Sequence, residues 1–203
     1  NSPGITNKTQ LWNGASWSAG NTLPWSAERV GSTGTQSLAL ATGGYLPGGP
    51  YTTNSAEWNG TSWTLGNAFP GTASNLSMSG TQTAALGFGG GNPGNGTFDY
   101  DGVNWSVNPA TMTMARGESG YSTLGTNTAS MVVDGPVSGP SATKATELFN
   151  GTAWTEIADV STGRATMGSC GTSTSMIIAC GSPNTKVAEE WNGAPASVKT
   201  VTT

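Results

Sequence analysis

Short apolar stretches alternate along the chain with clusters of Gly, Ser, Thr and Asn. Four of these stretches follow a Gly-Thr turn and end at glycine, at residues 38–42, 84–88, 130–133 and 175–180. Short apolar runs bounded by glycine and polar turn residues are typical of β-strands, and no stretch has the length or periodicity of an amphipathic helix. The pattern therefore predicts an all-β protein.

Two motifs recur with one period and out of phase with each other. The first is a corner of the type aromatic-Asn-Gly or aromatic-Asp-Gly, followed by a second aromatic residue five positions after the first. Its copies hold Trp12 and Trp17, Trp58 and Trp63, Tyr100 and Trp105, Phe149 and Trp154, and, in a degenerate form without the second aromatic residue, Trp191. The second motif is a Gly-Thr turn at Gly34, Gly80, Gly125 and Gly171, with spacings of 46, 45 and 46 residues. Such a period indicates a repeat architecture.

Each repeat accommodates four short strands. One strand precedes the Gly-Thr turn, as at 29–33 and 164–170, and the apolar strand follows that turn. The third strand runs into the aromatic corner, where Asn-Gly or Asp-Gly favours a hairpin, and the fourth leaves from the second aromatic residue. Four antiparallel strands per repeat are the blade of a β-propeller. We expect one domain over 1–203, with a half blade at 1–24 and blades at 25–67, 68–109, 110–157 and 158–203.

The first residues match the middle of a repeat, because residues 1–8 align with 181–186. About four full blades and a half blade are therefore expected. A propeller closes with about 4 to 8 whole blades, so the ring is expected to have five or more blades or to be completed by further chain.

A glycine doublet followed by two spaced aromatic residues resembles the kelch repeat. The resemblance is carried by Gly43-Gly44 with Trp58 and Trp63, and by Gly89-Gly90 with Tyr100 and Trp105. The later repeats depart from it, with Asp134-Gly135 and Cys180-Gly181 in place of the doublet. Kelch-like repeats this rich in Gly, Ser, Thr and Asn look like those of phage and marine microbial surface proteins. The resemblance implies an extracellular or virion-surface location.

Composition narrows the functional classes. The chain of 203 residues has 9% charged residues, a net charge of -4, 8 Trp and no histidine. With few cations, nucleic acid is not an expected partner. The absence of histidine removes the commonest general base and metal ligand, so we expect no enzyme activity, metal or cofactor. No stretch is long enough to insert into a membrane.

Candidate binding residues lie in the longer connections, which a propeller gathers on the face opposite its short turns. Arg29, Arg116 and Arg164 share one repeat position at the start of the innermost strand. They either form a ring of cations that holds a carboxylate or sulfate, or brace a neighbouring blade by hydrogen bonds to loop carbonyls, and their repetition favours bracing. Aromatic residues outside the repeated corners either stack against sugars or a protein partner, or cap a blade; they are Trp25, Tyr45, Tyr51 and Phe69.

The aromatic residues of the corners are expected to be the structural core between blades, since each buried Trp removes about 200 Å² from water. Cys170 and Cys180 end successive strands and should be about five residues out of register, roughly 16 Å apart. A disulfide needs Cα atoms within about 7 Å, so both are expected to be buried free thiols.

These features favour a non-enzymatic structural or binding module that associates with other protein chains, such as part of a phage tail fibre or a host-attachment protein. Two alternatives stay open: a lectin-like propeller that binds cell-surface glycans, and an accessory domain of a larger enzyme. Homo-oligomerisation is compatible with each of them.

Overall fold

The computed structural model of the protein describes residues 4–71, 73–91, 94–117, 122–133, 143–165, 167–182, 186–193 and 199–201. These residues form eighteen strands and contain no helix. The strands are β1 (Thr9–Trp12), β2 (Trp17–Gly20), β3 (Gly31–Gly34), β4 (Ala39–Thr42), β5 (Ser55–Trp58), β6 (Trp63–Leu65), β7 (Ser77–Thr81), β8 (Ala84–Phe88), β9 (Thr97–Tyr100), β10 (Trp105–Asn108), β11 (Ser122–Gly125), β12 (Ser130–Val133), β13 (Thr146–Phe149), β14 (Trp154–Ile157), β15 (Gly168–Thr172), β16 (Ser175–Ala179), β17 (Ala188–Trp191) and β18 (Lys199–Val201).

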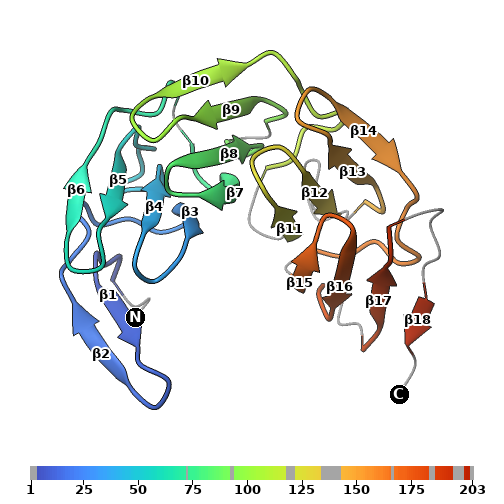
Figure 1. Cartoon of the computed structure of the whole chain (residues 1–203), viewed down its shortest axis with the longest axis horizontal. Coiled ribbons are helices and arrows are strands. Elements are labelled where there is room, and N and C mark those ends of the chain that lie inside the picture. The colour runs from blue at the N-terminus through green and yellow to red at the C-terminus, as the bar shows by residue number, and fades with distance from the viewer. Residues whose placement is uncertain are drawn as a thin grey trace.

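Consecutive strands pair in antiparallel order to give one two-stranded and four four-stranded sheets. We call β1–β2 the half blade, and β3–β6, β7–β10, β11–β14 and β15–β18 the first to fourth blades. Figure 1 shows the sheets standing around a common centre, with β3, β7, β11 and β15 innermost. The half blade and the fourth blade lie at the two ends of an open arc. The predicted all-β fold with four-stranded antiparallel blades is confirmed, and no closed ring is formed by the described residues.

The aromatic corners are four-residue turns held by their first side chain. In the first blade, Oδ1 of Asn59 accepts hydrogen bonds from the backbone N–H groups of Thr61 and Ser62, at 3.0 and 2.9 Å. The corners at Asn13, Asp101 and Asn150 repeat this arrangement. Each turn thereby sets the two corner aromatics opposite each other across the hairpin, as with Trp58 and Trp63, whose ring centroids are 5.3 Å apart.

The Gly-Thr turns need glycine for a steric reason. Gly80 has a φ of +97°, and a Cβ atom at this position would run into the carbonyl oxygen of Ala84. Positive φ is strained for residues with a side chain, and the collision with backbone excludes one here. The turn between β7 and β8 therefore depends on the absence of a side chain.

Neighbouring blades are joined by one repeated hydrogen bond. The indole N–H of Trp105 donates to Oγ of Ser55 in the preceding blade at 3.0 Å, and Trp154 donates to Oγ1 of Thr97 at 2.9 Å. Trp63 makes the same bond to Thr9 of the half blade at 2.9 Å. Apolar clusters surround these contacts, so each Trp both fills the space between two blades and fixes their relative position.

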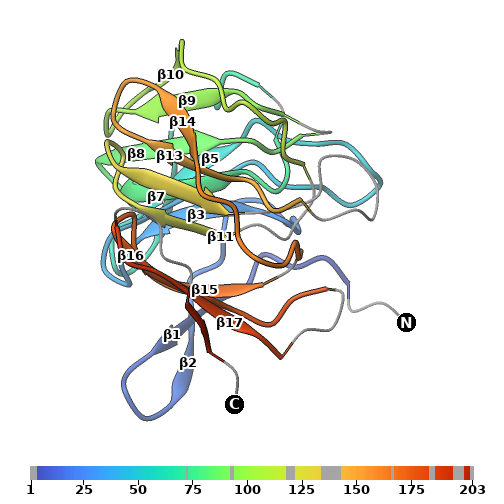
Figure 2. The same ribbon diagram turned by 90° about the vertical axis from the view of Figure 1, so that its right-hand side faces the viewer.

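The two faces of the arc differ as expected for four-stranded meanders. Turns between the first and second strands and between the third and fourth strands lie on one face, and the longer connections lie on the other (Figure 2). Three predicted strand starts are wrong: β3 begins at Gly31, β11 at Ser122 and β15 at Gly168, after the arginines that were placed at these starts. Arg29 and Arg164 belong to the connections that lead into the innermost strands.

Candidate functional site

Arg116 and Arg164 are buried braces and do not form a ring of free cations. Nη2 of Arg116 lies 3.1 Å from Oε1 of Glu147 in β13 and 3.1 Å from the carbonyl oxygen of Ala145. Arg164 likewise pairs with Glu189 in β17 and donates to the carbonyl of Val187 at 2.7 Å. Both arginines are at most 1% exposed. Both side chains contact carbonyls, as in the bracing alternative, but within their own blade, and their burial leaves no exposed guanidinium at either position.

The glutamates complete these braces and were not identified from the sequence. Oε2 of Glu147 accepts the backbone N–H of Thr113 at 2.7 Å, and Oε2 of Glu189 accepts that of Ser161 at 2.7 Å. Each carboxylate therefore ties the incoming connection to the third strand while neutralising a buried guanidinium. A buried charge is tolerated only with such pairing and hydrogen bonding.

Arg29 lies differently because its blade has no equivalent glutamate. The residue two positions before the corner aromatic is Glu147 in the third blade but Ala56 in the first. The Arg29 side chain is 47% exposed, the residue has a backbone φ of +60°, and its one ion-pair partner among the described residues is the neighbouring Glu28, at 3.5 Å. The same repeat position therefore gives a buried brace or a surface cation, depending on the strand opposite.

Trp25 and Phe69 are buried inside the blades and do not face solvent. Trp25 packs against Ala41 and Ala56, and its indole N–H donates to the carbonyl of Gly43 at 3.1 Å. Phe69 stacks on Phe98 with ring centroids 4.5 Å apart. Both aromatic residues are buried, so they cap blades and are not available for ligands.

In the connection that leaves the fourth strand, one apolar residue anchors the connection to its own blade. This pattern was not recognised in the sequence. The backbone N–H of the anchoring residue donates to the carbonyl five residues before the corner aromatic. The anchoring residues are Leu23, Phe69, Met112 and Val160, with donor–acceptor distances of 2.9, 2.8, 2.9 and 3.0 Å. The variable length of the connections hides this register in the sequence.

Tyr45 and Tyr51 are the loop aromatics that face solvent. Their ring centroids are 5.5 Å apart at an interplanar angle of 58°, and Tyr51 is 39% exposed. Tyr45 also pairs through its backbone with Glu28, which brings the Glu28–Arg29 ion pair to the same surface. An exposed aromatic pair beside a carboxylate and a guanidinium offers both stacking and hydrogen bonding.

Neither cysteine forms a disulfide bond, as expected, but the expectation that they are buried is wrong. Cys170 in β15 faces Ile177 in β16, while Cys180 lies beyond the end of that strand. Both are exposed. The innermost strand of the fourth blade presents Cys170 to solvent because it lies at the open end of the arc (Figure 1).

The corner aromatics divide into a buried and an exposed set. Five of them are buried as predicted, and Trp63 and Trp191 are half-buried; the buried ones are Trp58, Tyr100, Trp105, Phe149 and Trp154. Trp12 and Trp17 of the half blade are 42% and 66% exposed, which contradicts their assignment to the core. Their rings still stack on each other at 5.4 Å, so the corner forms without a covering strand.

The half blade exposes both its aromatic pair and one edge of β1. In every complete blade the third strand is hydrogen-bonded on both sides, whereas β1 pairs only with β2 among the described strands. A hollow of about 310 Å³ lies alongside, lined by Trp12, Trp17, Trp58 and Trp63 together with polar residues of β1 and the neighbouring turn. This apolar hollow and the open edge form one continuous surface, which we call the half-blade surface.

A glutamine in the neighbouring turn marks the missing contact at this surface. Gln82 of the second blade is buried and donates to the carbonyls of Ala39 and Trp58 in the first blade, at 3.0 and 2.7 Å. Gln36 holds the same turn position in the first blade, but its side chain is exposed and donates to no described residue. Of the two strands that accept from Gln82, the third strand has its counterpart in β1, whereas the half blade has no counterpart of the second strand, which supplies the Ala39 carbonyl.

Two titratable groups at one corner are shifted by their surroundings. Burial raises the pKa of the Tyr100 hydroxyl, and the hydrogen bond to Oε1 of Glu57, at 2.7 Å, raises it further. Hydrogen bonds from the backbone N–H groups of Asn104 and Val103 lower the pKa of the exposed Asp101 carboxyl. These contacts stabilise the corner and the interface between two blades, and they explain both shifts without a catalytic role.

Within the ranges that the structure describes, no cluster of three or more His, Cys, Asp or Glu side chains is arranged to hold a metal ion. The same part of the chain contains no helix long and apolar enough to cross a membrane. The half-blade surface and the Tyr45–Tyr51 pair are the two candidate binding sites. Comparison of the sequence with protein-family models and with curated proteins gave no match.

Proposed function

We propose that this protein is a non-enzymatic, kelch-like propeller module that joins other protein chains in an extracellular or virion-surface assembly. The half-blade surface carries the proposal, because it presents an unpaired strand edge next to exposed tryptophans. Unpaired edges recruit additional strands, and natural proteins usually cover them. Its occupant would be a β-hairpin of the kind that forms the two inner strands of the complete blades.

The complete blades indicate how such a hairpin would lie. In the second blade the ring of Trp105 covers Gly87 of β8 so closely that a Cβ atom built there would be 3.3 Å from the ring. Trp17 is the equivalent of Trp105 in the half blade and is 66% exposed. A hairpin paired with β1 would place its second strand beneath Trp17 and cover that side of the ring, as Gly87 lies against Trp105.

The added hairpin would also extend an interface that already exists. The half blade is fixed to the first blade by the bond from Trp63 to Thr9 and by a bond of 2.9 Å from Nδ2 of Asn21 to the carbonyl of Thr61. In the other blades the inner strands lie side by side next to such contacts, as β3 and β7 do. The side chain of Gln36 would then gain the second-strand carbonyl that Gln82 has in Ala39.

A labelled peptide of residues 77–88, which form the hairpin of β7 and β8, is the appropriate probe. Fluorescence anisotropy should show saturable binding of this peptide to the whole chain, and a peptide of the same composition in scrambled order should not bind. Replacing both exposed tryptophans, in the variant Trp12→Ser/Trp17→Ser, should weaken binding at least tenfold while the far-ultraviolet circular dichroism stays unchanged.

Equal binding of the scrambled peptide, or undiminished binding to the double variant, would refute this proposal. Analytical ultracentrifugation of the protein alone would show whether a second copy of the chain is itself a partner. In that case the concentration-dependent dimer should disappear in the same double variant.

The exposed tyrosine pair favours a second candidate function, carbohydrate binding. Tyr51 offers a ring face for a sugar, and the adjacent Glu28–Arg29 pair offers an acceptor and donors for its hydroxyl groups. A glycan array should then give hits that disappear in Tyr51→Ala, with Tyr100→Phe as a buried tyrosine control that leaves binding intact. An array without reproducible hits would leave assembly as the function.

A further inference from the structure

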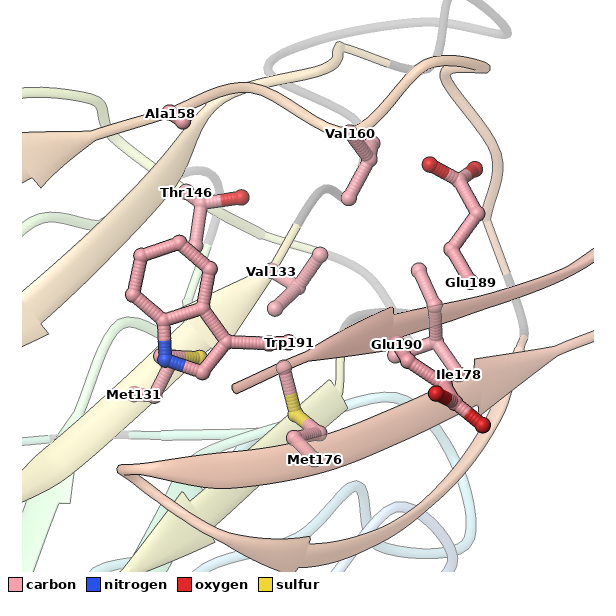
Figure 3. Close-up of a pocket in the computed structure, with 10 residues that line it drawn as sticks. All are labelled: Met131, Val133, Thr146, Ala158, Val160, Met176, Ile178, Glu189, Glu190 and Trp191. Carbon is pink, nitrogen blue, oxygen red and sulfur yellow. The ribbon is translucent and has the colours of Figure 1, made fainter. Parts of the chain in front are cut away.

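A small apolar cavity lies between the third and fourth blades. It encloses about 20 Å³ and is lined by Met131, Val133, Thr146, Ala158, Val160, Met176, Ile178, Glu189, Glu190 and Trp191 (Figure 3). In Figure 3 the hydroxyl group of Thr146 points toward the space bounded by Val133 and Val160. We call this space the Trp191 cavity.

Residues that line this cavity are the equivalents of those around Trp154, the second corner aromatic of the third blade. The ring of Trp154 packs in a cluster with Leu86, Phe88, Met112, Val132 and Phe149. The strand registers and the anchoring hydrogen bonds of the connections give the equivalent of each residue one blade later. In the same order, these equivalents are Met131, Val133, Val160, Ile178 and Trp191. All five line the Trp191 cavity. The cavity is therefore the place that a second corner tryptophan of the fourth blade would occupy.

The sequence explains why this blade has no such ring. In every other corner the second aromatic residue stands five positions after the first, whereas none of the residues that follow Trp191 in the sequence is aromatic. The fourth blade thus lacks the second corner ring at a site whose other residues keep the pattern.

Two buried polar atoms at the cavity are left without partners. Oγ1 of Thr146 has no hydrogen-bond partner among the described residues, although its equivalents Thr9, Ser55 and Thr97 each accept an indole N–H. The Thr146 residue is 2% exposed. Nε1 of Trp191 is likewise buried and unpaired within the described part of the chain. An unpaired buried polar group costs about 1–3 kcal/mol, so a ligand that satisfies Thr146 gains on binding.

We propose that the Trp191 cavity binds an indole ring, with the ring N–H donating to Oγ1 of Thr146. The walls supply the apolar and aromatic contacts that hold Trp154 in its own cluster, and the charge of Glu189 at the rim is neutralised by Arg164. The enclosed volume holds a single water and is smaller than an indole. Binding therefore requires the side chains of Met131 and Met176 to move, and methionine is the most adaptable apolar side chain for such a change.

Titration of 5-fluoroindole into the whole protein, observed by ¹⁹F NMR, tests the proposal without interference from the eight native tryptophans. Saturable line broadening or a shift with a dissociation constant in the millimolar range or below is expected. N-methyl-5-fluoroindole, which lacks the N–H donor, should bind about fivefold to tenfold more weakly, as expected for one lost hydrogen bond. The same ring reaches the site either as a free indole or as a tryptophan side chain, and competition by N-acetyltryptophanamide distinguishes these sources.

Three variants assign the binding to this cavity. Ala158→Leu, which enlarges a side chain of the cavity wall, should narrow the cavity and weaken 5-fluoroindole binding at least fivefold. Thr146→Val should remove the preference for 5-fluoroindole over its N-methyl derivative. Thr97→Val removes the equivalent hydroxyl at the complete contact with Trp154, and it should lower Tm while leaving 5-fluoroindole binding unchanged.

Several results would overturn the assignment. They are absence of saturable binding to the wild-type protein, equal affinity for the N-methyl compound, and undiminished binding to folded Ala158→Leu. The comparison of the two fluoroindoles needs only the wild-type protein, so it decides the question even if a variant fails to fold. The hairpin-peptide experiment concerns the opposite end of the arc, and its outcome is independent of this one.

Discussion

Replacing Trp154 by alanine should lower the free energy of unfolding by about 3–5 kcal/mol, the usual cost of truncating a core tryptophan. Trp17 occupies the same position of the same motif in the half blade. Because Trp17 is 66% exposed, its replacement by alanine should cost about 1 kcal/mol or less. The sequence surroundings of the two residues are alike, so the comparison isolates the effect of burial between blades.

The magnitude follows from the contacts of Trp154. Its ring is 7% exposed and lies 4.8 Å from the ring of Phe88 and 5.2 Å from that of Phe149. Burying about 200 Å² at about 25 cal/mol per Å² accounts for roughly 5 kcal/mol before ordering costs. Trp154→Phe keeps most of the ring but leaves the buried hydroxyl of Thr97 without its donor, so this variant alone should cost about 1–3 kcal/mol.

Equilibrium urea unfolding of the wild type and the three variants, followed by far-ultraviolet circular dichroism, measures these differences. The order of stability should be wild type, Trp17→Ala, Trp154→Phe, Trp154→Ala. Equal losses in Trp17→Ala and Trp154→Ala would refute the division into an exposed and a buried pair. A Trp154→Phe variant as stable as the wild type would show that the bond to Thr97 does not stabilise the blade interface.

Three further predictions concern the braces and the turns. Arg116→Met should cost about 3–5 kcal/mol in urea unfolding because it leaves the charge of Glu147 buried and unpaired, while Arg116→Met/Glu147→Leu should cost less than the sum of the single changes. The lowered pKa of Asp101 contributes stability that is fully present above about pH 4, the ordinary pKa of Asp. This stability is lost as the pH falls toward the lower pKa that Asp101 has in the folded protein. Asp101→Asn should keep the turn and flatten this part of the Tm–pH curve. Gly80→Ala should lower the free energy of unfolding by about 2 kcal/mol or more, through its positive φ and the contact with the Ala84 carbonyl, whereas an unchanged midpoint would contradict the turn geometry.

The strands and their grouping into sheets were predictable because each repeat carries its own turn signals. The corner Asn or Asp fixes the third and fourth strands, and the Gly-Thr turn fixes the first and second. The predicted starts of β3 and β15 were early because Arg29 and Arg164 were assigned to strands by position alone. An arginine is buried in the blade where the third strand supplies a glutamate to pair with it. This pairing joins distant parts of the repeat, so the position of the arginine alone does not reveal it.

Whether each aromatic residue is buried or exposed was less predictable than its place in the repeat. Trp25 was assigned to a loop surface because it lies outside the repeated corners, yet it is buried against Ala41 and Ala56. Trp12 and Trp17 follow the corner motif faithfully, yet they are exposed, since a motif specifies a hairpin and not what packs on it. The Trp191 cavity has a sequence signal, the absence of a second aromatic residue after Trp191, but the meaning of this signal depends on knowing which hydroxyl each tryptophan contacts.

Amide hydrogen exchange, measured by NMR on the monomeric protein, tests most directly whether the half blade leaves its inner edge open. We predict that the amides of β1 that point away from β2 exchange at least about tenfold faster than equivalent amides of β9, and that peptide 77–88 slows them. Protection of β1 equal to that of β9 in the free monomer would contradict the open edge, and with it the proposed role in assembly.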